Sequence, residues 1–395
     1  MSAQPIRIGY GLSLSGPLAS NGQAAHLAHQ IWAEDVNAKD GLLGRKVELV
    51  CRDDETNPQL VAGLYKQLLD EEKVDLVIGG YGDNSVAPAM PLIMERNRYF
   101  IGLMALAVNA TLNYPNYFAM IPTGPHPAEA LTEGFFAAAA TQTPKPATLA
   151  IVAADAPFSK APVQGAKAHA EAHGFRVVSE ALYPLTTTDL TPFLEPLKAL
   201  DPDILFFCSY LNDSVALIKA LDAVDLEPKM VGGAMIGPQN GAVKAQLGPL
   251  LNGVVNYEYW IPVPSLMNAE VAKMIATYQS RVGTSGADPL GYYVAPQAYA
   301  QLQVVGQAIE GTQSMEDAKL AHFTREAVFK TVVGDVRFGA GGGWAEPRVL
   351  TAQFQHIAGN DLANFAAAGA QAVIWPQKLA SSALIYPYAK AKLTT

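Results

Sequence analysis

The sequence contains few cysteines and few charged side chains. Only two of its 395 residues are cysteine, Cys51 and Cys208, and they lie far apart along the chain. Because free cysteines are usually buried, we expect two unpaired thiols rather than a disulfide. The two cysteines therefore do not decide between a reducing and an oxidising compartment. Charged residues make up 16% of the chain and apolar residues 50%. This composition is typical of a globular protein and excludes a disordered one.

A surplus of basic residues is also missing. Lys and Arg number 27 against 36 Asp and Glu, which gives a net charge of -9. Nucleic acids and anionic membrane surfaces bind basic faces, so the acidic balance argues against both partners. No apolar run reaches the ~18 residues of a membrane-spanning helix, so we expect no membrane insertion. The first residues show no signal-peptide pattern, which fits either a cytoplasmic protein or a secreted protein whose signal peptide was removed.

Motifs of common enzyme classes are absent. We find no G-x-S-x-G, H-E-x-x-H or Walker A sequence, and no G-x-G-x-x-G after a predicted strand. The glycine-rich segment 339–343 has no phosphate-binding helix behind it, so we interpret it as a turn. The acidic run 53–55 precedes Thr56-Asn57-Pro58, which indicates a strand exit and a helix cap rather than paired catalytic carboxylates. We therefore predict no enzymatic activity and no cofactor.

The histidines do not indicate a metal site. His169 and His173 are four residues apart on a predicted helix, but Lys167 and Glu171 beside them indicate a solvated face. His26 lies on the first predicted helix and could line a site at its start, although packing is the preferred interpretation. We expect no bound metal.

What the sequence does contain is a regular alternation of strand-like and helix-like segments. Short, almost continuous apolar runs alternate with amphipathic stretches, which predicts parallel sheets covered by helices on both faces. In the first part of the chain the predicted strands cover 47–51, 74–79, 99–103, 148–154, 177–181, 204–208 and 230–232, and the predicted helices 59–69, 85–95, 161–173, 190–200 and 214–224.

Two interruptions divide this series. One is the Pro/Gly segment 121–127, and the other follows Gly253. Beyond Gly253 we expect a strand at 254–260, helices at 269–281, 296–310 and 318–331, and a strand at 349–356. The length suits two domains. The predicted fold class is α/β, with two doubly wound parallel-sheet lobes.

The chain opens on a strand, a Ser-Gly-Pro loop and a small-residue helix that starts near Gly22. This arrangement places loop amides and a helix N-terminus at the carboxyl edge of a parallel sheet, where small anionic ligands bind. Segments 13–17, 35–44 and 53–58, in this order, resemble motifs of the periplasmic solute-binding proteins of ABC importers. The resemblance is to the branch that includes the branched-chain amino-acid receptors, and it covers nearly the whole chain.

The resemblance implies the type I periplasmic-binding fold, in which three hinge strands join two lobes. By position these strands fall near 121–124, 253–257 and 344–350. The first lobe would then hold 1–121 and 254–345, and the second 122–253 and 346–395. The resemblance also implies a small-molecule ligand captured between the lobes, delivery to the membrane permease of an ABC transporter, a periplasmic location after removal of a signal peptide, and a monomer.

Two departures from the amino-acid receptors bear on the ligand. Those receptors hold the ligand carboxylate with hydroxyl residues on two loops, which here are 81–85 and 104–108, and the second loop has no hydroxyl. They also hold the ligand ammonium with an acid, and the matching residue here is Ala234. A buried ammonium without an anionic partner costs several kcal/mol. We therefore expect a small aromatic or apolar carboxylate rather than an α-amino acid.

The predicted ligand-binding residues lie at strand exits or at the start of the first helix. Tyr81, Phe158 and Tyr210 would form aromatic walls, although each could belong to the core instead. Asp83 would either turn outward to cap a helix or accept a hydrogen bond from a ligand hydroxyl. Alternative functions are an amino-acid or amide receptor, a cytoplasmic amide sensor of the same fold, or a Rossmann-type enzyme. The full predicted set is Ser15, Asn21, Tyr81, Asp83, Asn84, Ser85, Ala105, Leu106, Ala107, Phe158, Tyr210, Ala234 and Met235.

Overall fold

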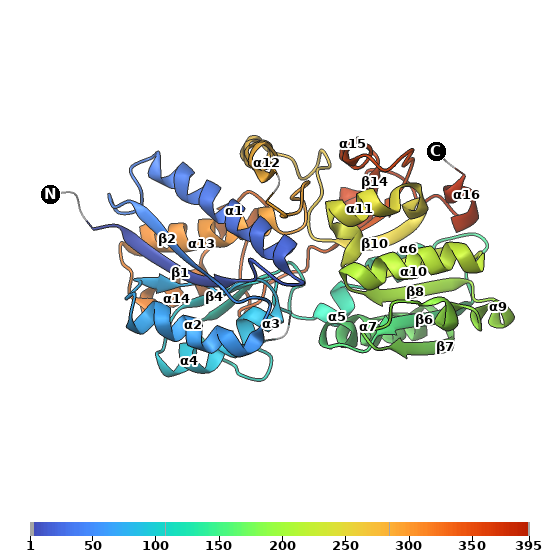
Figure 1. Cartoon of the computed structure of the whole chain (residues 1–395), viewed down its shortest axis with the longest axis horizontal. Helices are drawn as coiled ribbons and strands as arrows, with labels where there is room; N and C mark the ends of the chain where they lie inside the picture. The colour runs from blue at the N-terminus through green and yellow to red at the C-terminus, as the bar shows by residue number, and fades with distance from the viewer. Residues whose placement is uncertain (1–3, 107, 284, 394–395) are drawn as a thin grey trace. The chain divides into compact units, whose positions relative to one another are not determined.

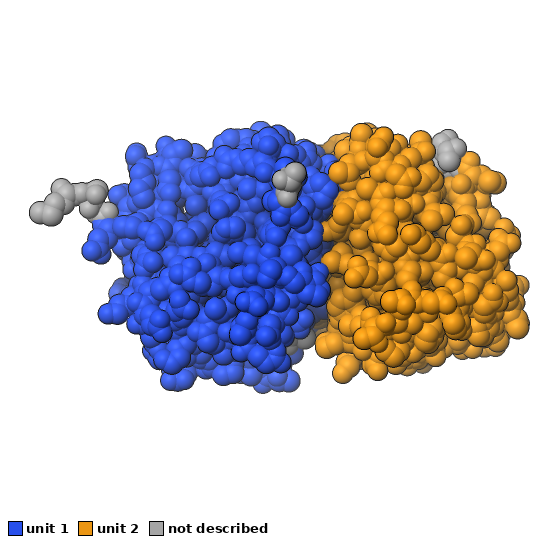
Figure 2. All heavy atoms as spheres, in the orientation of Figure 1, with its two compact units in different colours: residues 1–125, 266–347 blue, residues 126–265, 348–395 orange. Residues whose placement is uncertain are grey.

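The chain divides into two compact units. A computed structural model describes residues 4–106, 108–283 and 285–393. Unit 1 consists of residues 1–125 and 266–347, and unit 2 of residues 126–265 and 348–395 (Figure 2). Each unit contains parallel strands and helices, which confirms the predicted α/β class.

The sheet of unit 1 is parallel. Strand β1 (Ile6–Leu12) lies between β2 (Val47–Asp53) and β3 (Leu76–Val77). Strands β4 (Phe100–Leu103) and β5 (Tyr117–Met120) form a second parallel pair. Backbone bonds from Gly79 N to Ile101 O, 2.8 Å, and from Leu103 N to Gly80 O, 3.2 Å, join β4 to the chain that follows β3. The carboxyl ends of β1, β2, β3 and β4 therefore meet at one edge.

Helices cover both faces of this sheet. Helix α1 (Ala19–Asn37) packs beside α13 (Ala295–Thr312) and α12 (Ala269–Val282), and α2 (Pro58–Asp70) lies on the other side of β1 (Figure 1). The start of α2 follows the prediction, because the Asn57 side chain accepts from Gln59 N at 3.1 Å and Pro58 occupies the first turn.

Two helices predicted for unit 1 were wrong in extent. The predicted helix 85–95 is broken into α3 (Asp83–Val86), η1 (Ala87–Ala89) and α4 (Met90–Glu95), because Pro88 and Pro91 remove backbone donors. The predicted helix 318–331 ends with α14 (Asp317–Glu326). Residues beyond it form β11 (Phe329–Thr331), which turns at Gly334 and pairs antiparallel with β12 (Gly334–Val336). The β-branched and aromatic content of this stretch favours a strand.

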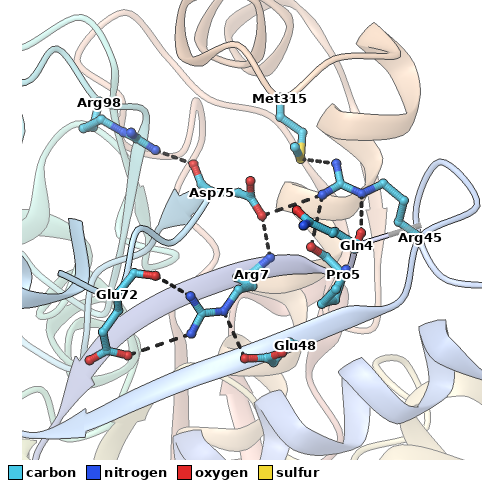
Figure 3. A network of polar contacts seen from close by, with 9 residues as sticks. All are labelled: Gln4, Pro5, Arg7, Arg45, Glu48, Glu72, Asp75, Arg98 and Met315. Carbon is cyan, nitrogen blue, oxygen red and sulfur yellow. Dashed lines mark hydrogen bonds and ion pairs between the residues drawn. The ribbon is translucent and has the colours of Figure 1, made fainter. Parts of the chain in front are cut away.

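Charged residues gather at the amino end of the unit 1 sheet (Figure 3). Arg7 of β1 pairs with Glu48 of β2 at 3.0 Å, and its backbone N–H donates to Asp75 at 2.8 Å. Arg45 lies 3.9 Å from the same Asp75 carboxylate, and Arg98 donates to the Asp75 carbonyl group. Ion pairs and hydrogen bonds between charged side chains thus stabilise the amino end of the unit 1 sheet. The side chains at its carboxyl end form a separate set.

Unit 2 contains a seven-stranded sheet with the order β14-β13-β10-β9-β8-β6-β7. Five strands are parallel, and β13 and β14 are antiparallel additions from the C-terminal part of the chain. The strands are β6 (Thr148–Ala154), β7 (Arg176–Tyr183), β8 (Ile204–Ser209), β9 (Met230–Met235), β10 (Val254–Glu258), β13 (Leu350–Phe354) and β14 (Gln371–Trp375).

The helices of unit 2 include several that the sequence pattern did not predict. The predicted helix 190–200 is split by Pro196 into α8 (Thr191–Leu194) and α9 (Leu197–Leu200). Helix α7 (Pro157–His173) packs on β6, β7 and β8, while α6 (Glu133–Ala140) packs on β10, β13 and β14. The remaining helical elements are α5 (Pro127–Ala130), α10 (Leu211–Val224), η2 (Gly237–Gln239), α11 (Gly241–Leu247), η3 (Gly248–Leu251), α15 (Leu362–Ala366), η4 (Gln377–Leu379) and α16 (Tyr388–Lys392).

The compact units and the predicted lobes have different bounds at three places, residues 122–125, 254–265 and 346–347, and the longest of these differences is the second. Residues 254–265, which the sequence analysis assigned to the first lobe, lie in unit 2. β10 pairs parallel with β9 and antiparallel with β13, so most of the segment 253–257 that was predicted as a hinge strand lies inside the sheet of unit 2. The chain instead passes from one unit to the other after Pro125, after Ser265 and after Pro347.

Two charged side chains are buried inside unit 2 and share one glutamine. Lys244 of α11 and Glu258 at the end of β10 are 0% and 2% exposed. Lys244 Nζ donates to Gln371 Oε1 at 2.7 Å, and Gln371 Nε2 donates to Glu258 Oε1 at 2.7 Å. Gln371 of β14 thus links the two charges across the sheet. Within the described ranges, no helix is long and apolar enough to cross a membrane.

Candidate functional site

The carboxyl edge of the unit 1 sheet is organised around Asp54. Its buried carboxylate accepts hydrogen bonds from Ser13 Oγ at 2.5 Å, from Thr56 N at 2.9 Å and from Ser85 Oγ. The exits of β1, β2 and β3 are therefore fastened to one group. Gly22 permits this closeness, because a Cβ atom there would lie 2.0 Å from the Ser13 carbonyl oxygen. The hydroxyl of Ser85, which was predicted to hold a ligand carboxylate, donates to Asp54 in this structure.

Asp53 organises the exposed part of the same edge. Ser15 Oγ donates to Asp53 Oδ2 at 2.7 Å, and the backbone N–H groups of Leu14 and Glu55 donate to Oδ1 at 2.9 and 2.8 Å. Partial burial raises the pKa of Asp53, but the hydrogen bonds from Ser15 and the backbone outweigh it, and the net result is a lowered pKa. Ser15 is exposed, and its hydroxyl is used within the loop.

Asp83 has a hydrogen-bond partner within the protein that was not predicted. Its Oδ1 accepts from the backbone N–H of Leu106 at 3.0 Å, so it joins the two loops that follow β3 and β4. Ala105 in the second loop is buried, Leu106 is half-buried, and Asn84 beside Asp83 is exposed. Ala107 lies outside the described residues.

Two tyrosines form an aromatic pair at this edge. The hydroxyl groups of Tyr81 and Tyr293 are 3.1 Å apart, and their ring centroids are separated by 6.2 Å at 80°. Both side chains are buried. Tyr293 was not predicted as a site residue, although the Gly291-Tyr292-Tyr293 sequence immediately before α13 offered a signal.

Two buried amides lie at the starts of α1 and α13. Asn21 and Gln297 are each 1% exposed. None of their four polar side-chain atoms has a hydrogen-bond partner among the described residues. Asn21 was predicted as a ligand residue, and Gln297 was not.

Unit 2 presents aromatic rings at the carboxyl edge of its own sheet. Phe158 opens α7 and Tyr210 precedes α10; both are half-buried, with ring centroids 5.8 Å apart at 75°. The Phe158 backbone N–H donates to Tyr210 Oη at 3.1 Å. Tyr257 extends the group, with its ring 6.4 Å from Phe158 and 5.2 Å from Tyr259. Tyr257 of β10 and Tyr259, which follows that strand, were not predicted as site residues, since 254–260 was expected in the other lobe.

Ala234 and Met235 end β9 and are completely buried. Asn256 of β10 holds Met235 in place, since its side chain accepts from Met235 N at 2.9 Å and donates to Met235 O at 2.8 Å. The acids near this edge have partners in the protein. Asp213 accepts from Tyr210 N at 2.9 Å and from Tyr183 Oη at 2.7 Å, and Glu258 accepts from Gln371.

The predicted packing of His26 and the predicted turn at 339–343 are confirmed. His26 packs on β1, with Nδ1 3.1 Å from Tyr10 Oη, and the glycine-rich segment is a turn closed by Gly339 N and Gly343 O at 2.7 Å. His169 and His173 have ring centroids 6.4 Å apart, within an aromatic cluster. Cys51 and Cys208 are both free. In the described part of the chain, no group of three or more His, Cys, Asp or Glu side chains could hold a metal ion.

Comparison with known proteins places this geometry in a family. The sequence profile of the periplasmic binding protein family matches residues 5–372. The Leu/Ile/Val-binding protein homolog 8 of Brucella abortus (strain 2308) is 24% identical over 326 residues, which cover 80% of each chain.

Solved structures share the fold at low sequence identity. One is a solute binding protein of an ABC transporter from Rhodopseudomonas palustris BisB5 in complex with 3,4-dihydroxy benzoic acid, with a TM-score of 0.75 and 19% identity, covering 90% of this chain and 94% of that one. Another is the substrate binding protein LivJ of Streptococcus pneumoniae in complex with isoleucine, with a TM-score of 0.74 and 17% identity. The match covers 90% of this chain and 97% of that one. The chain belongs to the periplasmic binding protein family and has the type I fold of ABC-transporter solute-binding proteins.

Proposed function

We propose that this protein is a periplasmic receptor, without enzymatic activity, that captures a small aromatic or apolar carboxylate and delivers it to an ABC permease. The observation that carries the proposal is the edge of unit 2. It presents the half-buried rings of Phe158 and Tyr210, and Ala234 occupies the position where the resemblance to amino-acid receptors implies an acid.

The charges around this edge support a ligand without an ammonium group. Asp213 and Glu258 already accept hydrogen bonds from protein donors. Leaving a ligand ammonium buried without an anion costs several kcal/mol. A flat apolar body avoids this cost, and an aromatic ring buries about 150–250 Å² of surface.

Each unit has its own set of residues that we propose as ligand contacts. In unit 2 they are the rings of Phe158 and Tyr210 and the apolar end of β9, Ala234 and Met235. In unit 1 they come from four short segments that surround the edge of the sheet. We assign to this set Ser15, Asn21, Tyr81, Asp83, Asn84, Ser85, Ala105, Leu106 and Ala107.

The similar structures support the fold of such a receptor but do not choose its ligand. The Rhodopseudomonas palustris protein is described with 3,4-dihydroxy benzoic acid and the Streptococcus pneumoniae protein with isoleucine, at nearly equal TM-scores of 0.75 and 0.74. The choice between these classes in this chain therefore depends on position 234 and on the rings.

A ligand screen tests the proposal. Thermal unfolding is measured with benzoate, 3,4-dihydroxybenzoate, 3-phenylpropenoate, leucine and isoleucine. Because a ligand that binds only the folded state stabilises it, the aromatic acids should raise the midpoint by a few degrees at saturating concentration. Stabilisation by leucine or isoleucine, with none by the aromatic acids, would show that the protein is an amino-acid receptor.

One observation favours a second candidate, a receptor for an aromatic or small amide. Asp83 places a carboxylate in the loop where a ligand anion was expected, and its charge repels a carboxylate. An amide carries no charge and can donate to Asp83. Benzamide is therefore included in the screen, and stabilisation by benzamide but not by benzoate would favour this candidate.

A further inference from the structure

We infer that Gln297, together with Asn21, determines ligand specificity by receiving a hydroxyl group of a ring-hydroxylated aromatic acid. The inference rests on the proposed function and names the ligand more closely. It starts from two buried side chains of unit 1 whose hydrogen-bonding capacity is unused by the described residues.

The position of Gln297 is fixed by groups on either side of it along the chain. Tyr293, four residues before it, pairs with Tyr81 at 3.1 Å. Gln301, four residues after it and one turn further along α13, donates to the carbonyl oxygens of Gly79 at 2.9 Å and Ile101 at 2.8 Å. These carbonyl groups belong to the chain at the exit of β3 and to β4. Gln297 therefore lies at the carboxyl edge of the sheet, one turn beyond the aromatic pair.

Asn21 belongs to the same region. It lies in the first turn of α1, next to Gly22, whose Cα approaches the Ser13 loop. The carbonyl of Ser20 accepts from Asp288 N at 3.4 Å, so the start of α1 lies against the loop that leads into α13. Further along the two helices, His29 Nε2 and Gln301 Oε1 are 3.0 Å apart, which shows that α1 and α13 run side by side from this end.

The comparison of Gln297 with Gln301 indicates a ligand role. Both are glutamines of α13 and both are at most 1% exposed. Gln301 uses its amide fully within the protein, through His29, Gly79 and Ile101. Gln297 uses neither its Oε1 nor its Nε2 within the described part of the chain, and the same holds for Oδ1 and Nδ2 of Asn21. Buried polar groups in folded proteins are almost always satisfied, so these two amides need a partner that is supplied on binding.

The chemistry of the two amides selects a hydroxyl group. Each amide offers an N–H₂ donor and a carbonyl acceptor. A carboxylate only accepts, so it would use the two N–H₂ groups and leave both carbonyl oxygens without a donor. A phenolic hydroxyl both donates and accepts, and its ring can lie beside the Tyr81–Tyr293 pair. A site built to bond a hydroxyl rejects the analogue that lacks it, because its own groups are then left unpaired.

Calorimetric titration of the whole protein with benzoate and with 3,4-dihydroxybenzoate tests this inference. The unmodified protein should bind the hydroxylated acid at least about tenfold more tightly. In Gln297→Met the ratio should fall to about one, through loss of affinity for the hydroxylated acid and not for benzoate. Asn21→Leu, on the other helix, should reduce the ratio in the same direction.

Two further variants of α13 serve as controls. Gln301→Met removes bonds to His29, Gly79 and Ile101, so it should lower the unfolding midpoint by several degrees, whereas Gln297→Met should leave it unchanged or raise it. Gln307→Met, ten residues away on the same helix, should leave the affinity ratio unchanged.

The outcomes separate the two levels of the argument. If a folded Gln297→Met protein keeps the affinity ratio of the unmodified protein, the inference is wrong while the proposed function stands. A bound structure in which the hydroxyl groups lie away from both amides would also overturn it. If neither acid binds the unmodified protein, the proposed function itself fails.

Discussion

The carboxyl edges of the two sheets use their side chains in opposite ways. In unit 1 the polar groups bond to one another, with Asp54 accepting from Ser13 and Ser85 and with Asp53 accepting from Ser15. In unit 2 the edge displays aromatic rings, and its polar groups mainly fix the backbone, as Asn256 does for Met235. The comparison teaches that unit 1 supplies a rigid hydrogen-bonded frame and that unit 2 supplies contact surface. Substitutions of the acids that organise the unit 1 edge, Asp53 and Asp54, should therefore act on stability, and substitutions of the half-buried rings of unit 2 on affinity.

The largest expected effect tests the rigid frame. Asp54→Ala leaves the hydroxyls of Ser13 and Ser85 without their acceptor in a buried setting. We expect the free energy of unfolding, measured by urea denaturation without ligand, to fall by about 3 kcal/mol. Glu48→Ala in β2, the strand that Asp54 follows, removes only a surface ion pair and should change the free energy of unfolding by less than about 0.5 kcal/mol. Equal effects of the two substitutions would refute the frame.

A second test of unit 1 uses pH. His29 is buried between β1 and α13, and burial lowers its pKa to about 3 from 6.5. Below pH 6.5 the unfolded chain binds a proton that the folded chain does not, so stability falls as the pH falls, by about 1.4 kcal/mol per pH unit. At pH 5 the loss should reach about 2 kcal/mol. His29→Gln should flatten this slope.

The control for the pH test is an exposed histidine. His322 lies on the surface of α14. His322→Gln should leave the pH dependence of urea denaturation unchanged. A slope that is the same in the His29→Gln and unmodified proteins would show that another group carries the dependence.

The contact surface of unit 2 is tested by affinity. Phe158→Ala removes the ring that packs against Tyr210 and Tyr257. We expect it to weaken binding of an aromatic acid by about tenfold, or about 1.4 kcal/mol, in calorimetric titration. Phe193→Ala removes another ring of unit 2, which packs on Tyr183, and should leave the affinity unchanged. If Phe193 matters as much as Phe158, the comparison loses its specificity.

The smallest expected effect concerns the charge in the loop of unit 1. Asp83→Asn keeps an acceptor for Leu106 N and removes a negative charge. Binding of a carboxylate should become about threefold tighter at low ionic strength, and the gain should shrink as salt is added. A weaker affinity in Asp83→Asn would mean that Asp83 accepts a hydrogen bond from the ligand.

The sequence predicted most of the strands that build the two sheets. The run 148–154 was predicted with the bounds that the structure shows, because a buried parallel strand is almost continuously apolar. The predicted helices 85–95 and 190–200 were too long, because the first is broken near Pro88 and Pro91 and the second near Pro196. Strand β10 was predicted as a strand, but its predicted lobe differs from its compact unit, because its pairing with β9 and β13 is a tertiary feature that the local sequence does not encode.

The site could be predicted only where a strand exit shows in the sequence. Tyr81, Phe158 and Tyr210 follow apolar strands, so their positions could be inferred. The central role of Asp54 could not, because it depends on Ser13 and Ser85 meeting at one edge from separate strands. Gln297 resembles any glutamine of a helix until its burial and its neighbour Gln301 are known.

Gln371, which bonds to both Lys244 and Glu258 inside unit 2, makes the fold of this unit depend on the C-terminal part of the chain. Lys244, Gln371 and Glu258 come from segments up to 127 residues apart, and only Gln371 belongs to the C-terminal stretch. A protein cut short before β14 would lose the hydrogen bond that Lys244 donates to Gln371, in a buried setting next to the ring of Phe354. Losing β14 would therefore remove this buried hydrogen-bonded link together with one edge strand of the unit 2 sheet.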